Sequence, residues 1–154
     1  MYLLDTNHCS RLLDDDPAVV TRLRQLDNAL VSTCVIVRGE LIFMVEKSDR
    51  RAENLQRVGA FLRAVNIYDI DSATADIYGR LKMALVAEFG PKDKTKRRKT
   101  RTHQLGVSEN DLWIAAVAKR HGLIVVSADS DFLRIQQADT LQLESWLPAP
   151  GLDT

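Results

Sequence analysis

Four acidic residues stand at positions that a folding role alone does not explain. Asp5 ends an apolar run that begins at residue 1, and Asp129 follows the clearest strand pattern in the chain, residues 123–127. Glu40 and Asp111 lie inside apolar helical patterns, so their carboxylates should face buried surfaces. Burying an unpaired carboxylate is unfavourable unless a proton, a base or a metal neutralises it. Together the four acids predict one shared acidic pocket.

Each acid also has a simpler interpretation. Asp5 could cap a helix, and Asp129 could be a turn residue. Asp111 lies where a capping box places its acid, and Glu40 could pair with an arginine. Asp131, which follows closely, fits a local helix cap better than a ligand. These separate roles would leave unexplained why four such acids occur in one small chain.

A divalent cation would resolve the repulsion between clustered carboxylates. Magnesium prefers oxygen ligands and keeps several waters, and manganese accepts the same ligands. No cluster of histidine and cysteine competes, because His8, His103 and His121 are scattered and are expected on the surface, in a loop or at a helix end. A cation in such a pocket acidifies water and neutralises charge on a phosphodiester. The acids therefore predict nuclease chemistry that depends on Mg²⁺ or Mn²⁺.

The elements that must position these acids alternate between strand and helix, which indicates an α/β fold with a parallel sheet. Strands are expected near 1–4, 30–33, 66–70 and 123–127, with a possible edge strand at 141–143, and helices near 6–13, 17–26, 37–46, 51–64, 72–89 and 109–121. In an open parallel sheet the ligand crevice lies outside the carboxyl ends of the strands. Asp5 and Asp129 would both lie at that edge.

Length and composition are typical of one globular domain, with 154 residues of which 45% are apolar. No apolar run is long enough to span a bilayer, and no leader of signal-peptide type precedes Asp5. The sequence therefore predicts a cytoplasmic protein with no membrane association. Cys9 and Cys34 have no metal-type spacing and are expected to be free thiols.

Charge is unevenly distributed although the net charge is zero. Residues 92–101 contain seven basic and one acidic residue, a net +6, so the rest of the chain carries −6. The stretch 91–106 has no apolar periodicity and is expected to be a basic loop inserted in the domain. Because an acidic pocket repels a polyanion, Lys96, Arg97 and Arg98 are candidate RNA-binding residues. An ordinary solvated surface is the alternative interpretation.

Four short segments, taken in order, resemble the successive motifs of PIN-domain nucleases, and most of all the VapC-type toxins of bacterial toxin–antitoxin pairs. They are Leu3–Asn7, Gly39–Leu41 followed by Glu46–Ser48, Asn110–Ala116, and Ser127–Phe132. The resemblance implies a three-layer α/β/α sandwich with a central parallel sheet over residues 1–147. Residues 91–106 would be an insert in this PIN domain, and residues 148–154 a loose tail.

The resemblance also implies roles for individual residues. Asp5 and Asp111 would be the main ligands of Mg²⁺ or Mn²⁺, and the other two acids of the quartet would complete the site directly or through water. Thr6 or Asn7 would hold a ligand in place or contact the scissile phosphate. Members of this family cut single-stranded or looped RNA, usually form homodimers and are silenced by a cognate antitoxin protein. The basic insert could also be where such an antitoxin docks.

The sequence thus predicts a metal-dependent endoribonuclease that acts as a toxin and leaves 5′-phosphate and 3′-hydroxyl ends. A PIN-like module that binds RNA or a partner without cutting is the alternative, although all four acids are present. An aspartyl-phosphate enzyme is less favoured, because such phosphatases usually carry a second aspartate where this chain has Asn7. A flap nuclease normally has further elements for which this chain lacks room.

Overall fold

The sheet at the centre of the molecule is parallel throughout, as expected. The computed structural model describes residues 1–26 and 30–148. Five strands pair in the order β3-β2-β1-β4-β5. They are β1 (Tyr2–Leu4), β2 (Val31–Cys34), β3 (Asn66–Tyr68), β4 (Ile124–Val126) and β5 (Leu143–Glu144). The α/β class predicted from the alternating pattern is confirmed.

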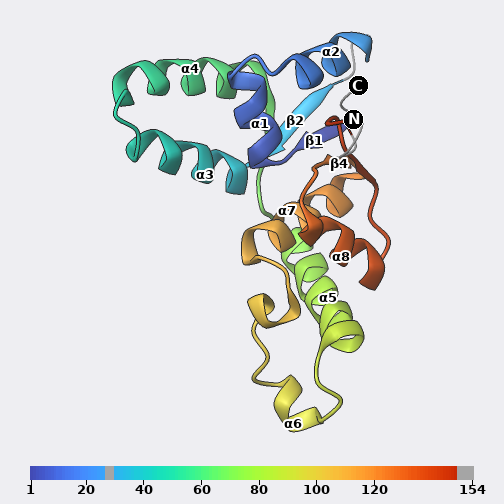
Figure 1. Cartoon of the computed structure of the whole chain (residues 1–154). Helices are drawn as coiled ribbons and strands as arrows, with labels where there is room; N and C mark the ends of the chain where they lie inside the picture. The colour runs from blue at the N-terminus through green and yellow to red at the C-terminus, as the bar shows by residue number, and fades with distance from the viewer. Residues whose placement is uncertain (27–29, 149–154) are drawn as a thin grey trace.

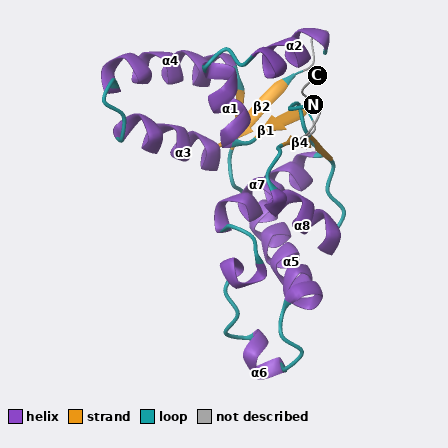
Figure 2. Cartoon of the chain, in the orientation of Figure 1, coloured by secondary structure: helices purple, strands orange, loops and turns teal. Residues whose placement is uncertain are grey.

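Helices cover the sheet in two groups, which makes the fold a three-layer α/β/α sandwich. They are α1 (Thr6–Leu13), α2 (Pro17–Gln25), α3 (Val35–Glu46), α4 (Arg51–Ala64), α5 (Ser72–Phe89), α6 (Lys94–Arg97), the 3₁₀ turn η1 (Thr102–Leu105), α7 (Glu109–His121) and α8 (Ser130–Ala138). Helices α1 to α4 lie on one side, while α5, α7 and α8 pack together on the other (Figure 1). Figure 2 shows the strands between these groups.

The central strands are apolar because both of their faces are covered. Leu3 and Leu4 of β1 and Val125 and Val126 of β4 are fully buried. Parallel strands inside an α/β sandwich characteristically read as continuous apolar runs. The two polar residues of β2, Ser32 and Thr33, are buried as well, and their hydroxyls donate to the carbonyls of Tyr2 and Leu4.

The edge strand begins two residues later than the pattern predicted, at Leu143 instead of Leu141. Leu141 is buried, and its carbonyl accepts a hydrogen bond from the side chain of Gln136. The Leu141 carbonyl is therefore bonded to a side chain of α8, and pairing with β4 starts at Leu143.

The stretch 91–106 is not the uninterrupted loop that its lack of apolar periodicity predicted. Asp93 caps α6 by accepting hydrogen bonds from the backbone N–H groups of Thr95 and Lys96. Thr102 and Leu105 of η1 are buried, and η1 packs against α5. The prediction was wrong for these two segments because a capping acid and two buried side chains order them without a full helical period.

The remaining expectations have different outcomes. Cys9 and Cys34 are buried free thiols, as expected. Over the residues described, no helix is both long and apolar enough to cross a membrane. The expected loose tail, 148–154, lies outside the described residues except for Pro148, and the domain limits 1–147 stay a prediction.

Helix α5 begins at Ser72 and ends at Phe89, as expected, and Asp71 is its N-cap. Asp71 Oδ1 accepts hydrogen bonds from the backbone N–H and the hydroxyl of Thr74, both at 2.7 Å. Its Oδ2 lies 3.1 Å from the guanidinium of Arg120 on α7. These contacts hold the pKa of Asp71 below its usual range, with the Thr74 hydroxyl as the largest cause. One side chain thus caps α5 and connects it to α7.

We expect Asp71→Ala to lower the free energy of unfolding by about 1–2 kcal/mol, the usual cost of a lost N-cap. Ser72→Ala is the matched control and should stay within about 0.5 kcal/mol of the wild type, as exposed surface changes do. Urea unfolding followed by circular dichroism measures both. An equal loss in the two variants would show that Asp71 is not the cap.

Candidate active site at the carboxyl ends of the strands

Asp5 lies where β1 ends and α1 begins, and it is 3% exposed. It caps α1, since its Oδ1 accepts the backbone N–H of His8 at 2.7 Å. The ring Nδ1 of His8 is 2.9 Å from the same oxygen, and Oδ2 accepts the hydroxyl of Ser127. The capping interpretation therefore holds for Asp5, and three hydrogen bonds from two residues, His8 and Ser127, fix the orientation of its carboxylate.

His8 is fully buried, which corrects the expectation of a surface, loop or helix-end histidine. As the third residue of α1 it turns inward beside the capping Asp5, and its Nε2 has no hydrogen-bond partner among the described residues. The signal in the sequence was the spacing: a histidine three residues after a capping aspartate returns to that carboxylate.

Glu40 of α3 bonds to a neighbour of Asp5 and to a neighbour of Asp111. Its Oε2 accepts the hydroxyl of Thr6, next to Asp5, and its Oε1 accepts the side-chain amide of Asn110 at 2.7 Å. The alternative of an arginine partner was wrong, since no arginine in the described part of the chain forms an ion pair with Glu40. Glu40 is half-buried, less than its apolar neighbours suggested.

The other acids gather where α7 and α8 begin. The hydroxyl of Ser108 accepts the backbone N–H of Asp111 at 3.0 Å and donates to its carboxylate at 2.6 Å. The backbone N–H of Ser108 donates to Asp131 at 2.6 Å, so Asp111 does not close the reciprocal capping box. Asp129 caps α8 by accepting the N–H of Asp131 at 2.9 Å. Asp129 is thus a cap as well as a member of the acidic group.

These surroundings change the pKa of Asp111, which lies in the first turn of α7. The pKa of Asp111 is raised to about 7, mainly by burial and also by the nearby carboxylates of Asp131 and Asp129, against the lowering effect of the Ser108 hydrogen bond. Asp111 therefore holds a proton at a pH where most carboxylates are ionised. A cation at this edge would favour its charged form.

Ser127, directly after β4, joins the two halves of the site. Its hydroxyl donates to Asp5 and accepts the backbone N–H of Asp129 at 3.0 Å. Asp5 is thereby linked through Ser127 to Asp129, and the carboxylate of Asp129 in turn lies near enough to Asp111 to raise its pKa.

The structure does not bring the basic candidates to this edge. Lys96 and Arg97 are in α6 and Arg98 follows it, and α6 lies beyond the far end of α5 from the sheet (Figure 1). Two aromatic side chains in the motif segments could in principle stack bases, but Phe132 is fully buried and Trp113 stacks on Tyr78 with ring centroids 3.9 Å apart. Both serve packing.

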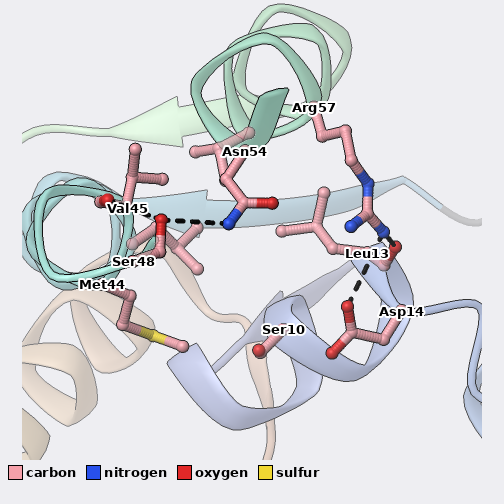
Figure 3. Close-up of a pocket in the computed structure, with 10 residues that line it drawn as sticks. Ser10, Leu13, Asp14, Met44, Val45, Ser48, Asn54 and Arg57 are labelled. Carbon is pink, nitrogen blue, oxygen red and sulfur yellow. Dashed lines mark hydrogen bonds and ion pairs between the residues drawn. The ribbon is translucent and has the colours of Figure 1, made fainter. Parts of the chain in front are cut away.

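Two hollows lie beside α3, the helix that carries Glu40. One, of about 470 Å³, adjoins Glu40 and Asn110 and is bordered by the exposed ring of Phe43. The other, of about 220 Å³, lies between α1, α3 and α4 and contains none of the four predicted acids (Figure 3). An ion pair of Arg57 with Asp14 crosses its rim.

A family model described as the PIN domain matches residues 2–138. The chain belongs to the PIN-domain family. The resemblance stated from the four sequence motifs is therefore confirmed.

Relatives of this PIN domain extend over almost its full length. The chain is 30% identical to ribonuclease VapC5 of Mycobacterium tuberculosis, covering 91% of this chain and 98% of the relative. It is 26% identical to the tRNA(fMet)-specific endonuclease VapC of Shigella flexneri, covering 94% and 97%. Among solved structures, VapBC2 from Rickettsia felis bound to a promoter DNA fragment matches with a TM-score of 0.75 and 26% identity, covering 94% and 98%.

The acids of this PIN domain fit a hard divalent cation in kind, since all of them offer oxygen and the pKa of Asp111 is raised. No group of three histidine, cysteine or acidic side chains gathers closely enough to hold a metal in the part of the chain that is described. One or two carboxylates at a time suffice for magnesium, which keeps several waters and takes phosphate oxygens from a substrate.

Sequence reasoning missed two contacts at this edge of the PIN domain: the hydrogen bond from the Ser127 hydroxyl to Asp5, and the one from the Ser108 backbone N–H to Asp131. Ser127 had been read only as the end of a strand, and Asp131 as a local cap. Asp131 accepts from a residue 23 positions earlier in the chain, which no local pattern could indicate.

In metal-free protein, we expect Asp111→Asn to be more stable than the wild type above pH 7. The folded-state pKa of Asp111 is about 7 and the unfolded value is near 4, so the wild type loses stability as the pH rises through that window. About three pKa units correspond to about 4 kcal/mol, and solvent screening of this partly exposed carboxylate reduces the expected difference to about 2 kcal/mol at pH 8. The difference should vanish below pH 4. Thermal melts in chelator measure it.

Asp76→Asn, which removes an exposed carboxylate on α5, serves as the control and should show no such difference. If Asp111→Asn is less stable than the wild type at pH 8, the ionised Asp111 carboxylate does not destabilise the folded protein.

Proposed function

We propose that this PIN-domain protein is a metal-dependent endoribonuclease, the toxin of a toxin–antitoxin pair. The proposal is supported by hydrogen bonds that link the four acids: Glu40 bonds to Thr6 beside Asp5 and to Asn110 beside Asp111, and Ser127 bonds to both Asp5 and Asp129. The relatives named ribonuclease and endonuclease support the same activity over more than nine-tenths of the chain. Because relatives that match nearly the whole chain are named ribonuclease or endonuclease, a module that binds without cutting is not favoured.

In this proposal the residues at the edge of the sheet have different roles. Asp5 and Asp111 would hold Mg²⁺ or Mn²⁺, with Glu40 and Asp129 completing the acidic quartet. The bound cation would supply charge neutralisation at the phosphodiester and a more acidic water. Ser127 donates to Asp5 and so fixes its orientation.

Three further residues would act around the quartet. His8 also orients Asp5, and Thr6 orients Glu40 through its hydroxyl. Asn7, exposed in the first turn of α1, is placed to contact a phosphate. Hydrolysis would leave 5′-phosphate and 3′-hydroxyl ends.

The partners follow from the relatives. The VapBC structures with which this fold aligns contain an antitoxin with the toxin, and we propose a cognate antitoxin here. A homodimer and a cytoplasmic location, where the RNA would be cut, belong to the same proposal.

We expect Asp5→Asn and Asp111→Asn each to reduce RNA cleavage by about a hundredfold or more, the scale for losing a group that assists the reaction directly. Asparagine still caps α1, so the fold should persist. Labelled RNA incubated with manganese, with and without chelator, measures cleavage, and Asp76→Asn is the control. Full activity in either acid variant, or cleavage unaffected by chelator, would remove the mechanism.

Millimolar manganese or magnesium should raise the melting temperature of the wild type, because a ligand that binds only the folded state stabilises it. At a metal concentration one hundred times its Kd the gain is about 2.7 kcal/mol, which corresponds to several degrees. Asp5→Asn and Asp111→Asn should each reduce this gain. A wild-type melting temperature that stays unchanged across the titration would contradict the cation site.

A further inference from the structure

A second charged hollow lies away from the acids, between α5 and the basic segment. This groove, the arm groove, has a volume of about 520 Å³. Its lining residues are Gly79, Lys82, Met83 and Val86 of α5, with Lys94, Arg97, Arg98 and Thr100 opposite. Four basic side chains and no acidic one therefore line it.

Most of the positive charge in the arm groove has no acidic partner. Across residues 1–26 and 30–148, no ion pair involves Lys94, Arg97 or Arg98. The one acid of this segment, Asp93, is occupied in capping α6. Clustered cations in a concave site attract an anion, which would relieve their mutual repulsion.

The arm groove begins close to the acidic edge. The ammonium of Lys82 lies 3.4 Å from Glu109 Oε1, and Glu109 stands two residues before Asp111 on α7. From Gly79 to Val86 the groove follows about 10 Å of helix, at 1.5 Å per residue. Helix α5 runs from beside α7 towards α6 (Figure 1).

The floor of the groove is open and lacks aromatic rings. A Cβ atom built on Gly79 would meet no atom within 4 Å, so the surface of α5 is free there. Met83 is 54% exposed and adds apolar surface. A groove with cations but no aromatic ring can hold phosphates without stacking bases, which means binding with little sequence preference.

We propose that the arm groove binds the phosphate backbone of single-stranded RNA on one side of the cleavage site. The inference rests on the proposed function. Four carboxylates at the edge would repel the phosphates of an RNA substrate. The RNA that extends away from the edge would be held by the cations of the groove, Lys82, Lys94, Arg97 and Arg98. An acidic protein segment and duplex DNA are the other polyanions, and the experiment separates them.

The structure divides the basic residues that the sequence had grouped together. Lys96 and Lys99 line a different hollow of about 300 Å³, together with Phe89 and Gln104. That hollow lies at the end of α5 and does not include Lys82. Lys96→Gln/Lys99→Gln is therefore a matched control for Lys94→Gln/Arg98→Gln, because both pairs remove two exposed cations from the same ten residues.

Binding is measured by fluorescence anisotropy with a labelled 20-nucleotide RNA, on the Asp5→Asn background in chelator. We expect Lys94→Gln/Arg98→Gln to raise the Kd about tenfold near 0.1 M salt and to reduce the salt slope by about 1.4, or 0.7 for each lost contact. The matched control should change the Kd by less than about twofold.

Cleavage with active protein provides an independent measurement. The groove variant should raise KM for the long RNA and leave kcat unchanged, as the loss of uniform binding does. An RNA of about five nucleotides that covers only the cleaved bond should be cut equally by both variants and the wild type.

Equal losses in the two double variants would overturn the arm groove as a site, and so would a groove variant that binds the long RNA like the wild type. A groove variant that keeps RNA but loses duplex DNA or an acidic peptide such as polyglutamate would overturn the assignment to RNA. In each of these cases wild-type cleavage would still stand. If the wild type neither cuts nor binds any RNA with manganese, the proposed function itself fails.

Discussion

Repulsion between carboxylates held close together at one edge of the sheet is the constraint on which the rest of this molecule depends. The pKa of Asp111 is raised to about 7 by its burial and by Asp131 and Asp129 beside it. A flexible loop would let these side chains separate. Here Asp5 follows the central strand β1, and Asp129 caps α8 after β4, so the packed layers keep them together. The stability of the sandwich thus maintains a charge arrangement that a cation can use.

Neutral donors, not basic side chains, orient the acids. Thr6 and Asn110 bind Glu40, and Ser127 binds Asp5. Within the described residues, no lysine or arginine forms an ion pair with any acid of the quartet. A permanent ammonium or guanidinium would neutralise the edge and occupy the place of a metal. Hydroxyl and amide donors fix the geometry and leave the negative charge in place.

The two signs of charge are kept apart along α5. Midway along this helix Lys82 lies 3.4 Å from Glu109 at the start of α7, two residues before Asp111, and beyond the end of α5 follows the basic segment 92–101. A net charge of zero therefore hides a molecule with an acidic edge and a basic arm. Nucleic acid binding depends on where the cations lie more than on their sum. Under the proposed function, this separation would let one end act on a phosphodiester while the other holds the RNA.

Periodicity and position by themselves determined the parallel α/β class, most helix limits and the four acids, because a buried strand end or an apolar helix face is recorded in neighbouring residues. The tertiary structure alone decided that His8 is buried against Asp5, that Ser108 gives its N–H to Asp131, and that Lys96 and Arg98 face different hollows. The physical reason is range. A local pattern reports which side of its own helix or strand is buried, whereas hydrogen bonds and the walls of a groove depend on residues far away in the chain.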